Sequence, residues 1–163
     1  MRNLLICFTL LLLLVSCKKQ NIELSEVEIY IEILKEDKTS SIDHTDFDHE
    51  NISELLKYRN DMQDISNFPR NPLSSFYMEE VTLGMYVLWI IESIRMEEIE
   101  DPDFYLFASL NPRILRVSTG ELVDQDDILP DMALAYFEWW NSSLLSEEKL
   151  QINPLENLDL IWN

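Results

Sequence analysis

The sequence predicts an all-α fold with about four main helices around a central apolar helix at residues 75–98, joined by extended loops. Apolar residues recur at helical spacing in several segments. Only two glycines, Gly84 and Gly120, occur in the chain, and folds with many tight turns usually need more glycine. The stretch "VTLGMYVLWII" is apolar nearly all round, which is typical of a helix covered on most sides.

The first helix is predicted to begin at Ser25. Ser25 and Glu28 have the spacing of a capping box, in which each side chain accepts from a free backbone N–H at the helix start. One face then holds apolar residues at i, i+3, i+4 and i+7. These residues are Val27, Tyr30, Ile31 and Leu34.

A polar loop at 38–49 separates this helix from a second one. The second helix is predicted to begin near Asp48–Asn51 and to end near Asn60. Its inward residues are Ile52, Leu55 and Leu56.

The central helix is predicted from Ser75 to Glu98. The two prolines of "NFPRNPLSSF" prevent a continuous helix before it. Gly84 in its middle costs about 1 kcal/mol relative to alanine, so we expect a neighbour to pack closely there. The apolar run spans about 11 residues, too few to cross a bilayer.

The C-terminal third is less regular. A short helix is predicted at Phe104–Leu110, and Ile114–Val117 is either a brief strand or an extended loop. A last long helix should begin between Asp127 and Pro130, because proline is favoured at the first helical position, and should run to about Leu145. Its inward face is predicted to be Met132, Tyr136, Phe137, Trp140 and Leu144. The tail is expected to pack back through Leu158, Ile161 and Trp162.

The N-terminus has the pattern of a secretory signal. Arg2 is followed by an uncharged run from 3 to 16, and its apolar core at 10–15 is too short for a membrane span. Residues Leu14 to Cys17 resemble the lipobox of bacterial lipoproteins. The resemblance implies a diacylglycerol on the Cys17 thiol, cleavage before Cys17 and acylation of its amine. Two or three acyl chains anchor a protein stably in the membrane, since each buried methylene contributes about 0.8 kcal/mol.

The expected organisation follows from that anchor. It consists of a signal peptide at 1–16, a lipid-anchored tether at 17–24 and a single acidic helical domain at 25–163. Cys7 lies in the segment that is removed, so the mature chain has no second thiol for a disulfide, a zinc site or a nucleophile.

The charge excludes some partners. The mature chain has 11 basic and 31 acidic residues, a net charge of −20. Such a surface repels phosphate backbones, so nucleic acid is not an expected partner. The charge favours solubility, with a basic protein partner or divalent cations as the alternative.

Two acidic stretches invite a metal-site hypothesis. "DHTDFDHE", at Asp43–Glu50, holds both histidines. An EF-hand loop starting at Asp46 would need glycine at Asn51 and an acid at Lys57, so the spacing fails. An acidic loop with a helix cap is favoured, and weak calcium binding stays open. "DQDDILPD" fails the same test and suits a helix N-terminus. No metal or other cofactor is expected.

No catalytic arrangement is predicted. Glu92 and Arg95 have the i, i+3 spacing of a partly buried structural ion pair, which is favoured over an acid–base role. Glu138 is expected to face water. Both histidines fall in one acidic loop, so no Ser-His-Asp triad is suggested. Trp139 lies at the margin of its helix's apolar face and is a candidate glycan-binding surface.

Two strings carry a family resemblance. "ISNFPRNPLSS", at Ile65–Ser75, and "LGMYVLWIIESIR", at Leu83–Arg95, together with the lipobox, resemble small uncharacterised lipoproteins of Bacteroidota. The resemblance implies an outer-membrane location. In that group, acids after the lipidated cysteine favour the cell surface, whereas Lys18 and Lys19 follow here. The periplasmic face and the cell surface therefore both remain open.

The sequence favours a lipid-anchored envelope lipoprotein acting as a non-enzymatic interaction or accessory module with a protein partner. One alternative is a lipoprotein that binds glycans or divalent cations, through Trp139 or the loop at Asp43–Glu50. The other is a carboxylate-dependent hydrolase of envelope polymers, in which Glu92 would be the acid or base.

Overall fold

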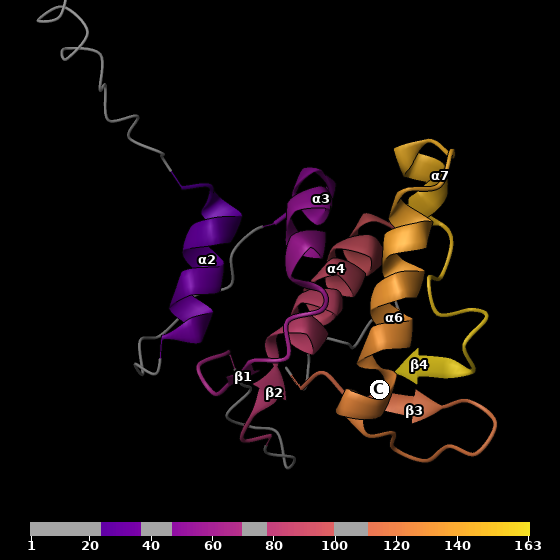
Figure 1. Ribbon diagram of the computed structural model, residues 1–163. Helices are drawn as coiled ribbons and strands as arrows, with labels where there is room; N and C mark the ends of the chain where they lie inside the picture. The colour runs from indigo at the N-terminus through magenta and orange to yellow at the C-terminus, as the bar shows by residue number, and fades with distance from the viewer. Residues whose placement is uncertain (1–23, 37–46, 70–77, 100–110) are drawn as a thin grey trace, which may run out of the picture.

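The computed structural model describes residues 24–36, 47–69, 78–99 and 111–163. Five α-helices lie in these ranges: α2 (Glu26–Lys35), α3 (Ile52–Leu55), α4 (Leu83–Glu98), α6 (Gln125–Trp140) and α7 (Ser146–Leu150). Two 3-10 turns, η1 (His49–Asn51) and η2 (Leu56–Tyr58), flank α3. Figure 1 shows α4 in the middle, with α3 and α6 on either side of it and α2 beyond α3. None of these helices has the length and hydrophobicity needed to cross a membrane.

The all-α prediction is wrong, because the described residues also form two small antiparallel sheets. The strands are β1 (Asp64–Ile65) with β2 (Val81–Thr82), and β3 (Ile114–Arg116) with β4 (Leu160–Trp162). Strands of two or three residues are too short to show a period-2 pattern. Their partners are also distant in the sequence, so no hairpin signal joins them. The fold is therefore mixed, with helices predominating.

The predicted first helix is confirmed. Ser25 Oγ accepts from the N–H of Glu28, and Ser25 N–H donates to Glu28 Oε2, each over 3.0 Å. The four predicted apolar residues are all buried. The Tyr30 hydroxyl lies 3.3 Å from that of Tyr86, which connects α2 to α4.

The second helix is present but divided. Asp48 caps it by accepting from the N–H of Glu50 over 2.8 Å, and the segment then passes from η1 through α3 to η2. Ile52, Leu55 and Leu56 are buried, as predicted.

The central helix begins later than predicted. Residues 75–77 lie outside the described ranges, residues 78–80 have no regular structure, and β2 occupies 81–82. The helix starts at Leu83, whose N–H donates to the Gln63 carbonyl over 2.8 Å. The pairing of β1 with β2 keeps this segment extended up to the helix.

The close approach predicted at Gly84 is confirmed. Its N–H donates to the Asp61 carbonyl over 2.8 Å. A Cβ at Gly84 would lie 2.6 Å from the Arg59 carbonyl oxygen. Only glycine lets the turn after η2 pack against the start of α4 in this way.

The last long helix differs from its prediction in start, end and orientation. It begins at Gln125 with Asp124 as its cap, so Pro130 lies within the helix rather than at its first position, and it ends at Trp140. Its buried face is Ile128, Leu129, Met132, Ala133, Tyr136 and Trp139. Phe137 is instead on the surface, where the Arg59 guanidinium lies 4.2 Å from its ring centre. Packing against α4 places Trp139 inward, whereas the pattern of apolar residues along the helix predicts Trp140 there.

The alternative of a strand after residue 113 is correct. β3 pairs with β4, and Leu115 also forms a bridge with Leu122, so three backbone segments lie side by side. Gly120 has φ 69° and donates its N–H to the Arg116 carbonyl over 2.7 Å, which closes the turn between them. The tail packs back through Leu160 and Trp162, whereas Ile161, predicted inward, is exposed.

Candidate functional site

The buried charges lie on one side of α4. Arg95 Nη2 is 2.7 Å from Glu92 Oε1, and Arg95 Nε is 3.0 Å from Glu92 Oε2. Each residue is 5% exposed. The spacing therefore produces the two-point ion pair that the sequence predicts, and the guanidinium matches the carboxylate geometry.

Neighbouring elements complete this network. The Tyr136 hydroxyl donates to Glu92 Oε2 over 2.7 Å, and Trp162 Nε1–H donates to the Tyr136 oxygen over 2.8 Å. Arg95 Nη1 donates to the Leu150 carbonyl over 3.0 Å. Burial, and then the negative charge of Glu92, raise the pKa of Tyr136 well above 10.0. Both oxygens of Glu92 are engaged inside the protein, an arrangement that stabilises the fold rather than presenting an acid or base to a substrate.

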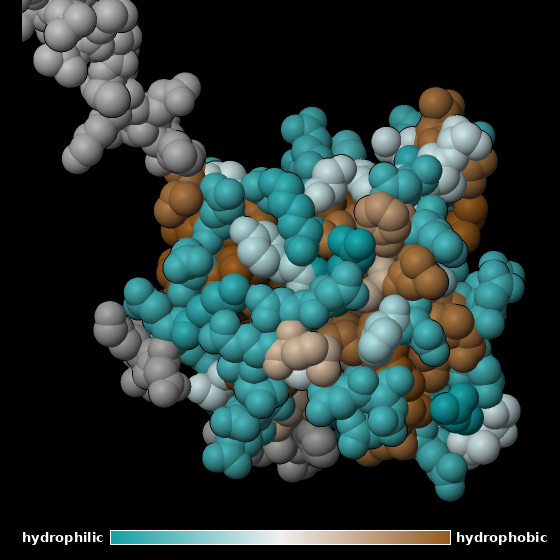
Figure 2. Space-filling view, in the orientation of Figure 1, coloured by the Kyte–Doolittle hydropathy of each residue, from teal (hydrophilic) through white to brown (hydrophobic). Residues whose placement is uncertain are grey.

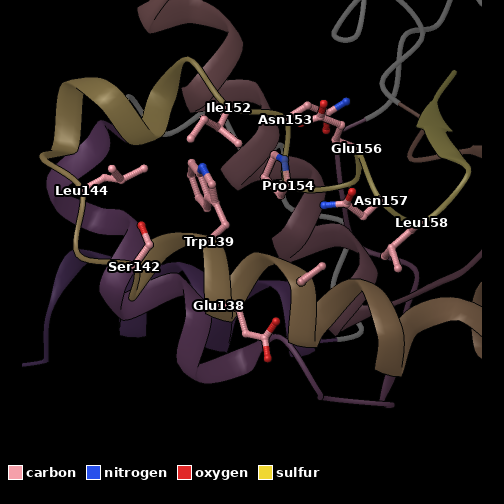
Figure 3. A pocket seen from close by; sticks show the side chains of 11 residues that line it. Glu138, Trp139, Ser142, Leu144, Ile152, Asn153, Pro154, Glu156, Asn157 and Leu158 are labelled. Atoms are coloured by element: carbon pink, nitrogen blue, oxygen red, sulfur yellow. The ribbon is translucent and has the colours of Figure 1, made fainter.

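A first pocket lies between the end of α6 and the chain that follows it (Figure 3). We call it the C-terminal pocket; its volume is about 330 Å³. It is lined by Ala135, Glu138, Trp139, Ser142, Leu144, Ile152, Asn153, Pro154, Glu156, Asn157 and Leu158. No basic side chain belongs to this lining.

The structure overturns the idea of Trp139 as an exposed glycan platform. Its side chain is 7% exposed, and its Nε1–H donates to the Lys149 carbonyl over 2.7 Å. Its ring centre lies 5.3 Å from that of Trp140, and Trp139 also forms part of the wall of the C-terminal pocket. Glu138 is exposed, as expected, and Figure 3 shows its carboxylate pointing away from Trp139.

A second, more open hollow lies where β1 and β2 meet the start of α6. We call it the acidic groove; its volume is also about 330 Å³. It is lined by Asp64, Glu80, Val81, Thr82, Val123, Asp124, Gln125 and Asp126. Four of these eight residues are acids and none is basic, so the groove has a negative potential.

The β3–β4 sheet presents apolar side chains on both faces. Its inner face, with Ile114, Leu160 and Trp162, packs on the core. Its outer face consists of Leu115, Leu122 and Ile161, together with the exposed Val117 that follows β3 and donates its N–H to the Asp159 carbonyl. We call these four residues the apolar sheet face. Leu122 is 54% and Ile161 49% exposed, and Figure 2 shows hydrophobic side chains at the surface over β4.

The apolar sheet face was missed by sequence reasoning, which placed Ile161 inward. Side chains alternate between the two faces of a strand. If Leu160 and Trp162 of "LIW" are assigned to the inner face, Ile161 must lie on the outer one.

The remaining predicted site residues do not converge. Cys17 and residues 43–46 lie outside the described ranges. Within the acidic loop, Asp48 serves as a cap, and His49 Nδ1 lies 3.2 Å from Glu98 Oε1. In the ranges that the structure covers, no three metal-ligating side chains gather around one point.

The comparisons identify a family but no function. A family model described as "Domain of unknown function (DUF4943)" matches residues 21–163. No curated protein and no solved structure matches the chain.

Proposed function

We propose that this chain, which belongs to the DUF4943 family, is a lipid-anchored envelope lipoprotein that acts as a non-enzymatic interaction module. The observation that carries the interaction role is the apolar sheet face. Outward faces of antiparallel strands are ordinarily polar, whereas this one has four aliphatic side chains in adjacent positions. Contiguous apolar surface of this kind is typical of a contact with another macromolecule.

The anchor is inferred from the sequence. The lipobox at Leu14–Cys17 supports lipidation of Cys17, with residues 1–16 as the signal peptide. The family match begins at residue 21, just after Cys17, which supports a short tether at 17–24 followed by the domain. The resemblance to Bacteroidota lipoproteins supports the outer membrane, on its periplasmic face or at the cell surface.

The anchor is tested by membrane partition. Wild type, Cys17→Ala and Cys7→Ala chains are expressed in a bacterial host with lipoprotein export and separated by detergent phase partition. We expect Cys17→Ala to leave the detergent phase and to keep its signal peptide. Cys7→Ala is the matched control and should behave as wild type. Equal partition of all three chains would refute lipidation at Cys17.

The interaction is tested by crosslinking in native envelopes. The double variant Leu122→Thr/Ile161→Thr removes two apolar side chains from the apolar sheet face. Leu134→Thr removes an equally exposed leucine from α6 and is the control. We expect one dominant crosslinked partner with wild type and Leu134→Thr, and its loss with the double variant. A crosslinking pattern that does not change with the double variant would refute the proposed surface.

The C-terminal pocket favours a second function, binding of a small neutral glycan. Trp139 forms part of its wall, and Asn153 and Asn157 add polar groups suited to sugar hydroxyls. Titration of the domain with envelope glycan fragments, followed by tryptophan fluorescence, tests this. Asn157→Ala should weaken any binding seen, and a titration without signal counts against the function.

A hydrolase gains no support, because both oxygens of Glu92 are engaged by Arg95 and Tyr136.

A further inference from the structure

We infer that the acidic groove binds the guanidinium group of a partner's arginine. The inference rests on the proposed function because it assumes a protein partner, and it adds the chemical group that this partner presents. Val123, which lines the groove, directly follows Leu122 of the apolar sheet face, so a single partner can reach both.

The first observation is the position of three polar residues at the β1–β2 sheet. Asp64 is the direct partner of Thr82 across the two strands, and directly paired residues project to the same side of a sheet. Glu80 comes directly before β2 and also lines the groove. All three line the groove, and the start of α6 forms its other wall with Asp124 and Asp126.

The second observation is a buried hydroxyl that has no partner. Thr82 is 4% exposed, and its Oγ1 makes no hydrogen bond. It is the cap residue of α4 but makes no capping bond, because the carbonyls of Gln63 and Asp61 already accept from the first two N–H groups. Buried hydroxyls are normally satisfied. Thr82 lines the groove, so a buried hydroxyl without a partner lies at the wall that holds the carboxylates.

The third observation is the lack of internal neutralisation. In the ranges that the structure covers, Asp64, Glu80, Asp124 and Asp126 form no ion pair with a basic side chain. The single side-chain bond found among the four is the cap, in which Asp124 Oδ1 accepts from the N–H of Asp126 over 3.0 Å. The helix start accounts for Asp124 and Asp126, but not for Asp64 and Glu80.

The arrangement selects the kind of cation. No three carboxylates converge on one point in the described ranges, as a metal ion would require. The acids instead line a hollow of about 330 Å³. A guanidinium group suits this geometry, because it is planar and carries five N–H donors directed to separate acceptors.

The test is calorimetric titration of the whole chain, anchor included, in non-ionic detergent. The probe is tetra-arginine amide, with tetralysine amide and calcium chloride as separate titrations. The groove variant is Asp64→Asn/Asp124→Asn. The matched control is Asp127→Asn/Asp131→Asn, which makes the same change in charge at exposed acids of α6 outside the groove.

We expect tetra-arginine to bind at one site, more tightly than tetralysine or calcium. The groove variant should bind about fivefold more weakly, because it removes two exposed charge pairs that contribute about 0.5 kcal/mol each, and the control should lose less. Thr82→Val should also weaken binding while leaving the unliganded fold at least as stable. Equal losses in groove variant and control, preference for calcium, or no binding by wild type would each overturn the inference. Leu122→Thr/Ile161→Thr should retain tetra-arginine binding, so failure of the groove is distinguished from failure of the apolar sheet face.

Discussion

Tyr136 donates its hydroxyl hydrogen to Glu92 Oε2 over 2.7 Å, and this bond joins α6 to α4 in the interior. The same carboxylate binds Arg95 at two points. The interior thus holds a negative and a positive charge, each with hydrogen-bond partners. Removing either charge should cost more than removing both, because a lone buried charge has no compensation.

Glu92→Ala should therefore lower the free energy of unfolding by about 3–5 kcal/mol, since it leaves Arg95 buried without its counter-ion. Urea unfolding monitored by circular dichroism measures this. The double variant Glu92→Met/Arg95→Met removes both charges and should recover most of the loss. A single variant as stable as wild type would contradict the structural role of the pair.

Tyr136 also predicts a pH dependence. Its pKa is raised well above 10.0 by burial and by Glu92, so the folded chain keeps a proton that the unfolded chain loses. Its contribution to stability is thus complete below about pH 10 and is lost as the pH rises above that value. The urea concentration at the unfolding midpoint should decrease from about pH 8 to about pH 11, and this decrease should be smaller for Tyr136→Phe than for wild type. Equal falls would contradict the prediction. Burial also raises the pKa of Tyr30, so Tyr30→Phe is the parallel variant.

Gly84→Ala tests the contact between α4 and the turn after η2. Alanine favours a helix by about 1 kcal/mol over glycine. Its Cβ would, however, lie 2.6 Å from the Arg59 carbonyl oxygen, a backbone atom that cannot move away freely. We expect a net loss of about 1–3 kcal/mol in unfolding free energy, as in overpacked cores. Chemical denaturation measures it, and a gain in stability would show that the turn moves without cost.

The parts of the fold predicted correctly are those set by neighbours in the sequence. The capping box at Ser25 and Glu28, the buried face of α2 and the ion pair of Glu92 with Arg95 all depend on residues within one or two helical turns. Gly84 was predicted correctly because a glycine within a helix costs stability and so indicates a close neighbour.

The parts that were missed depend on contacts between distant segments. β3 and β4 form only because the tail returns to residues 114–116, which no local pattern encodes. The choice of Trp139 over Trp140 as the buried ring depends on what α6 packs against. The acidic groove brings together β1, β2 and the start of α6, and the acids at 124–131 suggested only a helix N-terminus when read alone.

The two faces of the β3–β4 sheet give a final prediction, because replacing an aliphatic residue by threonine should affect stability differently on each face. Ile161→Thr changes an exposed side chain of the apolar sheet face, so its effect on the free energy of unfolding should lie within about 0.5 kcal/mol. It should also lower the fluorescence of a hydrophobic dye, since it removes exposed apolar surface. Leu160→Thr changes the buried neighbour and should cost about 2–3 kcal/mol, with increased dye binding as the core loosens. Thermal unfolding and dye titration of the two variants measure this contrast. Similar losses from both substitutions would mean that Ile161 is covered in solution, by a second copy of the chain or by another segment of its own.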